Sequence, residues 1–342
     1  MTKPRLELTR EQILGYRRRV QGLDERWPMR ADSLRRAAWA GLQDSMPRAA
    51  VLSIHARVAD TAPNSWEDPS LVQLWGPRFQ LYVVAWPDLP LFSLGRLPDD
   101  AKGRRKAEDL AARLHAFLDG RTTLTYGQAG DGVGVHPNAL RYAAATGTVV
   151  IRWAGARAPT IWTVPAPEIT PAEAREELAR RYLHVYGPTT AAAFTRWASI
   201  GAALGRAAFD ALGDSSTPVR TPIGDAWILN SDLPTLRAAA GPMAPARLLP
   251  SGDAFFLLWG ADRELLVPDA GQRGALWTSR VWPGAVLVSG ELAGTWRRDG
   301  TNVTVEPWRR LTTKEQAAVE AEAANLPLPD LRGPIVVRWV GS

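Results

Sequence analysis

The chain has 342 residues, enough for two to four compact units rather than one core. Its apolar fraction of 46% and charged fraction of 22% are ordinary for a folded globular protein. With no cysteine and four widely spaced histidines, the sequence excludes disulfides and thiolate chemistry and favours neither a metal site nor a cofactor. The net charge of +6 suits a polyanionic partner, although an arginine-rich composition also follows from a GC-rich coding sequence.

The termini and apolar runs carry no membrane signal. The first residues (MTKPRLELTREQ) lack the apolar core of a secretory signal, and Arg196 and Arg206 interrupt the most apolar candidates for a span. We therefore expect a cytoplasmic, nucleoid-associated protein without membrane contact.

Residues 1–100 form the first expected unit. Residues 8–21 predict a helix capped by Thr9, residues 31–42 predict an amphipathic helix, and Pro47 is expected to open a third. Residues 78–86 alternate apolar and polar side chains and predict a strand.

Two later stretches repeat one pattern of helix, second helix and hairpin. In residues 101–166, helices are expected at 103–120 and 136–147, followed by a hairpin over 148–164 with its tip at Gly155-Ala156. The glycine-rich stretch 127–134 lacks the lysine of a phosphate loop and is expected to be a plain loop.

Residues 167–244 show the same pattern more clearly. A proline-rich linker at 165–171 leads into a helix, and 188–229 then gives two short helices and two extended pieces around Ile223-Gly224. Helix, turn, helix and hairpin together are typical of a winged helix, which usually places its second helix in the DNA major groove.

The pattern of apolar and turn-forming residues changes near residue 245. Short apolar runs separated by Gly, Pro and Asp indicate a small antiparallel β domain over 245–342, interrupted by one helix at 312–327. The expected fold class is therefore α+β. Fifteen tryptophans are spread over all units, and most are expected in the cores.

Nearly the whole chain resembles one known family. The most specific segments of the resemblance are residues 40–58, 181–200, 246–268 and 284–296. They are similar to the bacterial winged-helix family of AlkZ/YcaQ-type DNA glycosylases, which excise alkylated or cross-linked purines. The resemblance implies three tandem winged-helix modules followed by a C-terminal β-barrel, curved into a concave surface that binds DNA.

In that family the chemistry is placed on a glutamine–apolar–glutamine or glutamine–apolar–aspartate motif. The resemblance assigns this catalytic position to Gln43, Asp44 and Ser45, of which only Gln43 keeps the family's residue type. In an extended segment Gln43 and Ser45 would point the same way and share a water, while Asp44 would project oppositely unless the backbone shifts. The alternative is a polar turn that caps the next helix.

A second family motif, similar to Arg-Gly-Thr-Leu-His, is also altered. Arg78 is kept, but Phe79, Gln80 and Tyr82 replace the glycine, threonine and histidine. Each candidate DNA-binding arginine has an alternative interpretation as a solvated surface charge. The candidates lie on the three modules and are Arg35, Arg36, Arg48, Arg78, Arg141, Arg152, Arg206 and Arg220.

The leading hypothesis is a monomeric protein that binds double-stranded DNA. Excision of alkylated or cross-linked purines is the activity that the resemblance implies, without metal or cofactor. The alternative, favoured by Ser45 and Tyr82, is a non-catalytic winged-helix protein that regulates genes or sequesters damaged DNA. A scaffold for protein interactions is a third hypothesis.

Overall fold

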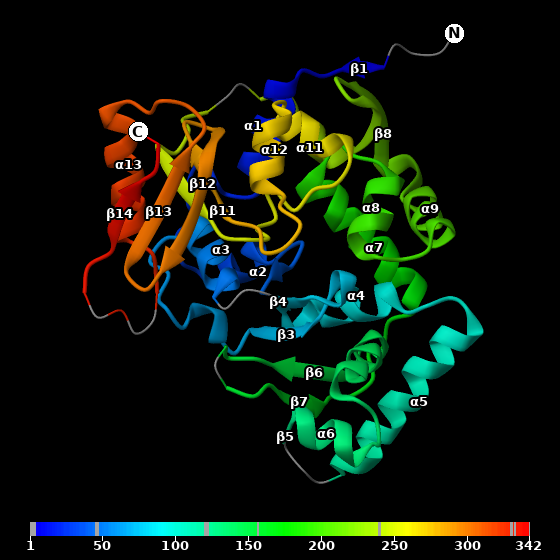
Figure 1. Ribbon diagram of the computed structural model, residues 1–342. Helices are drawn as coiled ribbons and strands as arrows, with labels where there is room; N and C mark the ends of the chain where they lie inside the picture. Colours follow the sequence, from blue (N-terminus) through cyan, green and yellow to red (C-terminus); the bar gives the residue numbers. More distant parts are fainter. Residues whose placement is uncertain are drawn as a thin grey trace.

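A computed structural model describes residues 5–44, 48–119, 123–155, 157–238, 241–328, 331 and 333–341. The fold is mixed α and β, and its described strands form three three-stranded sheets and one five-stranded sheet (Figure 1). The three small sheets share no strand with one another.

The small sheets share one plan, a hairpin with an additional edge strand. The first sheet has the order β2 (Leu42–Gln43), β4 (Leu81–Ala85) and β3 (Leu71–Trp75). The second has the order β5 (Leu124–Thr125), β7 (Thr160–Thr163) and β6 (Val149–Arg152). The third has the order β1 (Leu6–Glu7), β8 (Ser216–Thr221) and β9 (Gly224–Leu229).

The N-terminal segment lies with the third sheet. β1 runs parallel to β8, and α1 (Arg10–Val20) packs on α10 (Leu233–Arg237) and α7 (Pro171–Tyr186). The predicted helix at 8–21 is confirmed, including its cap, because the Thr9 side chain accepts from the N–H of Gln12. Residues 5–20 thus lie with a hairpin and helices about 200 residues further along the chain.

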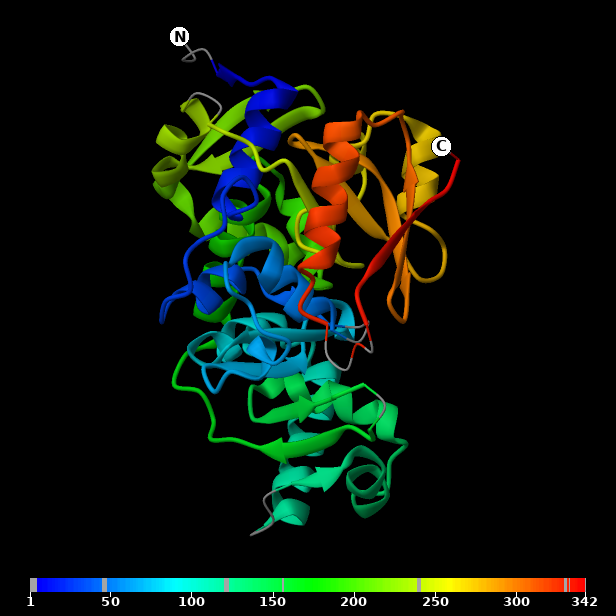
Figure 2. The same ribbon diagram turned by 90° about the vertical axis from the view of Figure 1, so that its left-hand side faces the viewer.

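The first sheet lies in the middle of the molecule with α2 (Ser33–Ala37), α3 (Ala49–Arg57) and α4 (Leu89–Ser93) around it (Figures 1 and 2). The helix expected over 31–42 stops at Ala37. Gly41 adopts a φ of 72°, which any other residue would find strained, and leads directly into β2. The helix expected from Pro47 is present from Ala49, and Pro47 itself lies outside the described residues.

The second sheet forms the lower end of the molecule with α5 (Ala101–Leu118) and α6 (Tyr126–Gly132) (Figures 1 and 2). The predicted hairpin and first helix are confirmed. The second helix is a 3-10 helix, Pro137–Thr146, rather than an α-helix. The loop expected at 127–134 is wrong, because a Thr125–Gln128 capping box starts α6 despite its glycines.

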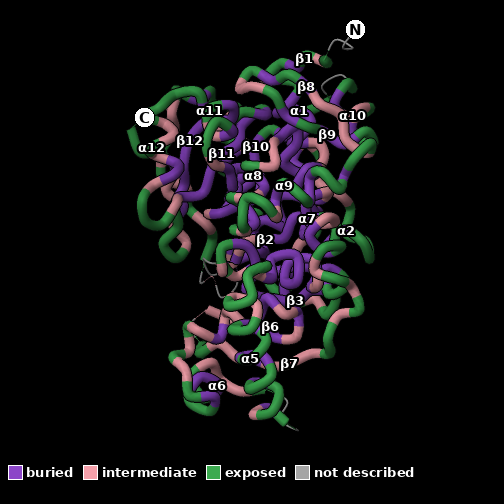
Figure 3. Tube along the Cα trace, turned by 90° about the vertical axis from the view of Figure 1, so that its right-hand side faces the viewer, coloured by how far each residue is buried: buried purple, intermediate pink, exposed green. Residues whose placement is uncertain are grey.

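The third part contains the predicted helices α7, α8 (Ala191–Ala198) and α9 (Ala202–Ala211). Its core is an aromatic cluster in which Tyr182 stacks on Tyr186 with ring centroids 4.6 Å apart and also packs on Trp197 at 5.1 Å. All three rings are buried, as Figure 3 shows for the surrounding backbone.

The C-terminal sheet has the order β10 (Ala246–Leu249), β11 (Gly284–Val288), β12 (Glu291–Asp299), β13 (Asn302–Pro307) and β14 (Val336–Trp339). The expected closed antiparallel barrel is wrong, since β10 and β14 remain the two edges of the described sheet and β14 runs parallel to β13. The intervening α13 (Thr313–Ala324) packs against β10, β11 and β14, burying Val319 and Ala323. The remaining helices, α11 (Ala261–Leu266) and α12 (Ala270–Leu276), lie in the crossover from β10 to β11.

A buried ion pair joins α3 to the segment after β10. Arg57 donates two hydrogen bonds to Asp253, at 2.7 and 2.8 Å, and both side chains are almost fully inaccessible. The carboxylate also accepts from the Ser53 hydroxyl and the Phe255 N–H, while Gln21 accepts from Arg57. Every oxygen of Asp253 therefore has two donors, which offsets the desolvation of the charge.

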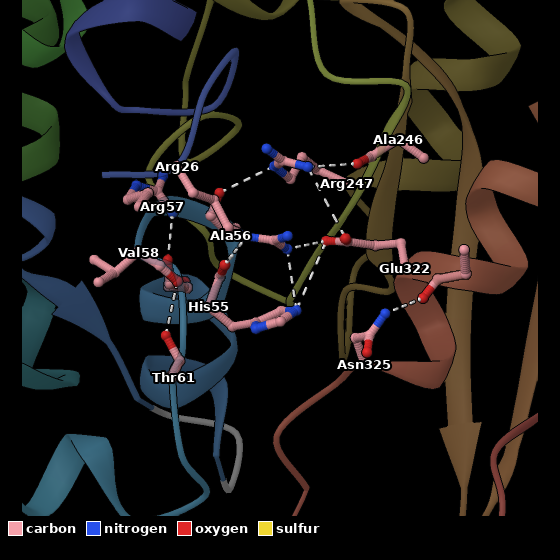
Figure 4. A network of polar contacts seen from close by, with 12 residues as sticks. Arg26, His55, Ala56, Arg57, Val58, Thr61, Ala246, Arg247, Glu322 and Asn325 are labelled. Carbon is pink, nitrogen blue, oxygen red and sulfur yellow. Dashed lines mark hydrogen bonds and ion pairs between the residues drawn. The ribbon is translucent and has the colours of Figure 1, made fainter. Parts of the chain in front are cut away.

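A second polar network ties α3 to α13 (Figure 4). Arg247 donates to the carbonyl oxygen of Ala56, and Arg26 donates to the His55 carbonyl and to Glu322. Burial, together with the nearby Arg26 and Arg247, lowers the pKa of His55 to about 3. The imidazole is consequently neutral and takes the hydrogen bond from Arg26 at its Nε2.

We predict that Asp253→Ala lowers the free energy of unfolding by about 3–5 kcal/mol, because it leaves the Arg57 guanidinium buried and unpaired. Urea denaturation measures the loss. Asp225→Ala is the matched control, since it breaks the exposed pairs with Arg5 and Arg220 and is expected to leave stability nearly unchanged. Equal losses in the two variants would contradict the role given to Asp253.

Candidate active site

A cavity of about 580 Å³ lies between the first sheet and the segment that follows β10. We call it the Gln43 cavity. Its lining comes from β2, from the turn between β3 and β4, and from residues 251–282: Gln43, Arg78, Gln80, Ser251, Leu257, Trp259, Arg263, Trp277, Thr278, Ser279, Arg280, Val281 and Trp282.

Gln43 reaches this cavity from β2, where it pairs with Tyr82 of β4. Its side-chain amide lies against Gly252, whose φ is 76°; a Cβ there would come within 2.9 Å of Gln43 Nε2. Any other residue here would be strained by the positive φ and would displace the Gln43 amide. The Gln43 side chain lines the cavity, and among the described residues no side-chain hydrogen bond involves its amide.

Asp44 points away from the cavity, as the alternation of an extended segment predicts. Its carboxylate is buried and accepts from the Ala50 N–H at 3.0 Å and the Gln73 amide at 2.6 Å. Asp44 thus caps the first turn of α3. Burial raises the pKa of the carboxyl to about 6, against the opposing effect of the two hydrogen bonds. Ser45 lies outside the described residues.

Aromatic rings and guanidinium groups form the walls of the cavity. Arg78 lies over the ring of Trp259 at 4.9 Å, and Arg263 packs against Trp277 at 4.8 Å and Trp282 at 5.3 Å. The described lining includes three arginines and no carboxylate. The site therefore offers planar surfaces for a base and cations for phosphate, but no described anionic side chain.

The altered second motif has a structural explanation. Arg78 and Phe79 adopt left-handed φ values of 58° and 54° in the turn before β4, which exposes Arg78 to the cavity. Tyr82, at the position of the family's histidine, is 1% exposed, and a Cβ on Gly41 or Gly76 would meet its ring. Tyr82 is thus a core residue, whereas Arg78 and Gln80 of this motif line the cavity.

The other predicted arginines are dispersed. Arg35 forms an ion pair with Asp88 at 2.7 Å. Arg36 lies over the Trp27 ring and lines a different cavity, which has no lining residue in common with the Gln43 cavity. Arg48 and Arg152 both pack on the Trp66 ring, at 5.0 and 4.8 Å.

Three more of the predicted arginines lie on the outer two sheets and their helices. Arg141 contacts Phe79, which follows Arg78 in the turn, at 5.4 Å. Arg206 is exposed on α9, and Arg220 is exposed on β8 and paired with Asp225. The structure therefore brings Arg78 into the Gln43 cavity, places Arg141 next to its turn, and leaves the other six elsewhere.

Comparison with known proteins agrees with this geometry. A family model described as DNA glycosylase AlkZ-like matches residues 35–327. The chain belongs to the AlkZ-like DNA glycosylase family. An interstrand DNA cross-link repair glycosylase of Streptomyces sahachiroi is 32% identical over 163 residues, a match covering 46% of this chain and 43% of that protein. The solved Streptomyces sahachiroi DNA glycosylase AlkZ has the same fold, with a TM-score of 0.78, 22% identity, and coverage of 98% of this chain and 100% of that chain.

Most of the residues that line the cavity could not be identified as site residues from the sequence. Ser251 and Gly252 stand in one of the segments that carry the resemblance, and Trp259, Trp277 and Trp282 fall within the next thirty or so residues. The clustering of three tryptophans around Arg263 was a signal, but only the packing shows that these side chains face Gln43.

The described residues contain no group of three or more His, Cys, Asp or Glu side chains arranged to hold a metal ion. Within the same residues, each helix is too short or too polar to cross a bilayer.

We predict that the contribution of Asp44 to the free energy of unfolding falls by on the order of 2–3 kcal/mol as pH rises from about 4 to about 6. The sign follows because burial raises the pKa of the folded carboxyl above its unfolded value, so deprotonation favours the unfolded state. Asp44→Asn should remove this component, whereas Asp210→Asn, at an exposed position on α9, should keep the wild-type profile. Parallel urea titrations measure it; identical profiles for wild type and Asp44→Asn would contradict the assignment.

Proposed function

We propose that this protein hydrolyses the N-glycosidic bond of a damaged purine in double-stranded DNA. The observation that carries the proposal is the Gln43 amide, which faces a cavity walled by tryptophans and arginines at the position of the family's catalytic motif. In this proposal, Gln43 holds the attacking water, the tryptophan rings stack on the base, and Arg78 contacts the DNA backbone.

We also propose that the three small sheets and their helices are three winged-helix modules, with β3–β4, β6–β7 and β8–β9 as the wings. Support comes from the repeated hairpin, from helices α8 and α9 preceding the third wing, and from the likeness in fold to a DNA glycosylase. The protein is proposed to act on the duplex as a monomer.

The chemistry of the cavity restricts the substrate. Cleavage passes through a sugar with oxocarbenium character, which enzymes commonly stabilise with carboxylates. Since the described lining has none, the base itself must leave readily. An N-alkylated purine meets this need because its positive charge is neutralised as the bond breaks. The relative named as an interstrand DNA cross-link repair glycosylase supports a cross-linked base as the substrate.

Within the motif, the proposed roles differ. Gln43 touches the water, whereas Asp44 acts by holding the start of α3 and the Gln73 amide. Ser45 stays the candidate for a second contact to the same water.

The second candidate function is binding of damaged DNA without base release. The observation that favours it is the absence of a carboxylate from the described lining, together with a Tyr82 ring that is buried in the core. A regulator or a lesion-sequestering protein would have the same binding surface.

We predict that Gln43→Ala abolishes release of 7-methylguanine from duplex DNA while affinity for the duplex is retained, because the amide is needed for the water and not for the phosphates. Base release is followed by the alkali-labile abasic sites that it leaves. Gln316→Ala, on α13, changes the same residue type outside the cavity and should retain full activity.

The outcomes separate the two candidate functions. Loss of abasic sites only in Gln43→Ala supports hydrolysis. Tight binding by the wild type without any base release from 7-methylguanine-containing or cross-linked duplexes would overturn the glycosylase proposal in favour of lesion binding.

A further inference from the structure

A second hollow, of about 620 Å³, runs along α5 and is separate from the Gln43 cavity. We call it the α5 groove. Its lining comes from α5 and from the segment packed beside it: Ala101, Lys102, Arg105, Lys106, Asp109, Leu110, Arg113, Val135 and Ala139. Three of the chain's positive side chains, Lys102, Arg105 and Lys106, are exposed within one turn of this helix.

The amphipathic pattern of α5 places these cations on its solvent side. Leu110, Leu114 and Leu118 are buried against the core of the second sheet, while positions 102, 105, 106, 109 and 113 follow one exposed stripe. The inward face accounts for the folding of the helix, so the charged stripe has no evident role in stability.

The charges along the stripe are poorly balanced. Lys102 and Lys106 stand four residues apart, a spacing at which like charges repel on a helix. Among the described residues, no ion pair involves Lys102, Arg105, Lys106 or Arg113, and Asp109 is the one acid in the lining. A solvated helix face usually intersperses both signs, so this arrangement favours a polyanionic ligand.

The groove connects to the candidate active site through a row of contacts. Lys106 Nζ lies 4.0 Å from the ring of Tyr142, and that ring packs edge-on against Phe79 at 5.1 Å. Phe79 is adjacent to Arg78, which lies over Trp259 in the Gln43 cavity. A ligand extending from the cavity across the β3–β4 turn would therefore meet α5.

We infer that the α5 groove binds the sugar–phosphate backbone of the duplex that flanks the damaged base. The inference rests on the proposed function insofar as the ligand is DNA. Phosphates of the flanking arm supply the anions, and the exposed stripe supplies the cations without reading base identity. With 18 residues, α5 is about 27 Å long, the length of about 8 base pairs.

The test compares two triple variants with the same loss of charge. Lys102→Gln/Arg105→Gln/Lys106→Gln removes three of the four cations that line the groove and leaves Arg113. Arg237→Gln/Arg310→Gln/Lys314→Gln removes three exposed cations from α10, from the loop before α13 and from α13. Circular dichroism and thermal unfolding first establish that both variants are folded.

Binding is measured over a range of salt concentrations on a long duplex with a central 7-methylguanine, and on duplexes with either arm cut to about 4 base pairs. On the long duplex, the α5 variant should reduce the log–log salt slope by about 2–3, at about 0.9 for each lost phosphate contact. The control variant should keep the wild-type slope. On one of the two shortened duplexes, wild type and the α5 variant should become equal.

Each outcome bears on one proposal. A wild-type slope for the α5 variant, or a defect that persists on both shortened duplexes, overturns the groove while leaving the proposed function standing. Failure of the wild type to bind any of these duplexes at low salt overturns the proposed function itself.

Discussion

The bidentate ion pair between Arg57 and Asp253 is the constraint on which the candidate site depends. It joins α3 to the turn after β10, and it is buried on both sides. Asp253 follows Gly252 directly, and Gly252 is the residue that lies against the Gln43 amide. Because a buried, fully hydrogen-bonded carboxylate has little freedom to move, the pair fixes the distance between the two halves of the cavity wall.

The short β2 segment lies at a junction of three parts of the molecule. Gln43 faces the C-terminal part, and Asp44 caps α3. Gln73, which donates to Asp44, accepts from the Trp153 N–H of the second part. One buried amide thus links the candidate motif to the β6–β7 hairpin. The same alternation that turns Gln43 toward the cavity turns Asp44 into this network, so the proposed water-binding side chain and the structural one lie on opposite sides of the segment that begins with β2.

The site's electrostatics are unusual for glycosidic cleavage. Positive guanidinium groups and tryptophan rings surround a neutral amide, an environment that suits a base and its phosphates better than it suits a developing sugar cation. Under the proposed function, the damage itself has to drive the departure of the base. This arrangement also explains why lesion binding and lesion hydrolysis are close alternatives for the same cavity.

The amino-acid sequence alone determined the elements whose causes are local. Thr9, Thr170 and Thr312 start α1, α7 and α13 as capping residues, and the alternation of side chains in the extended segment that begins with β2 turned Gln43 and Asp44 to opposite sides. Only the tertiary structure decided the rest, because contacts between residues two hundred positions apart leave no local pattern. It placed β1 beside β8 and left the C-terminal sheet open. Through Asp253 it also brought Gly252 and three tryptophans to Gln43, while most of the expected arginines paired or packed elsewhere.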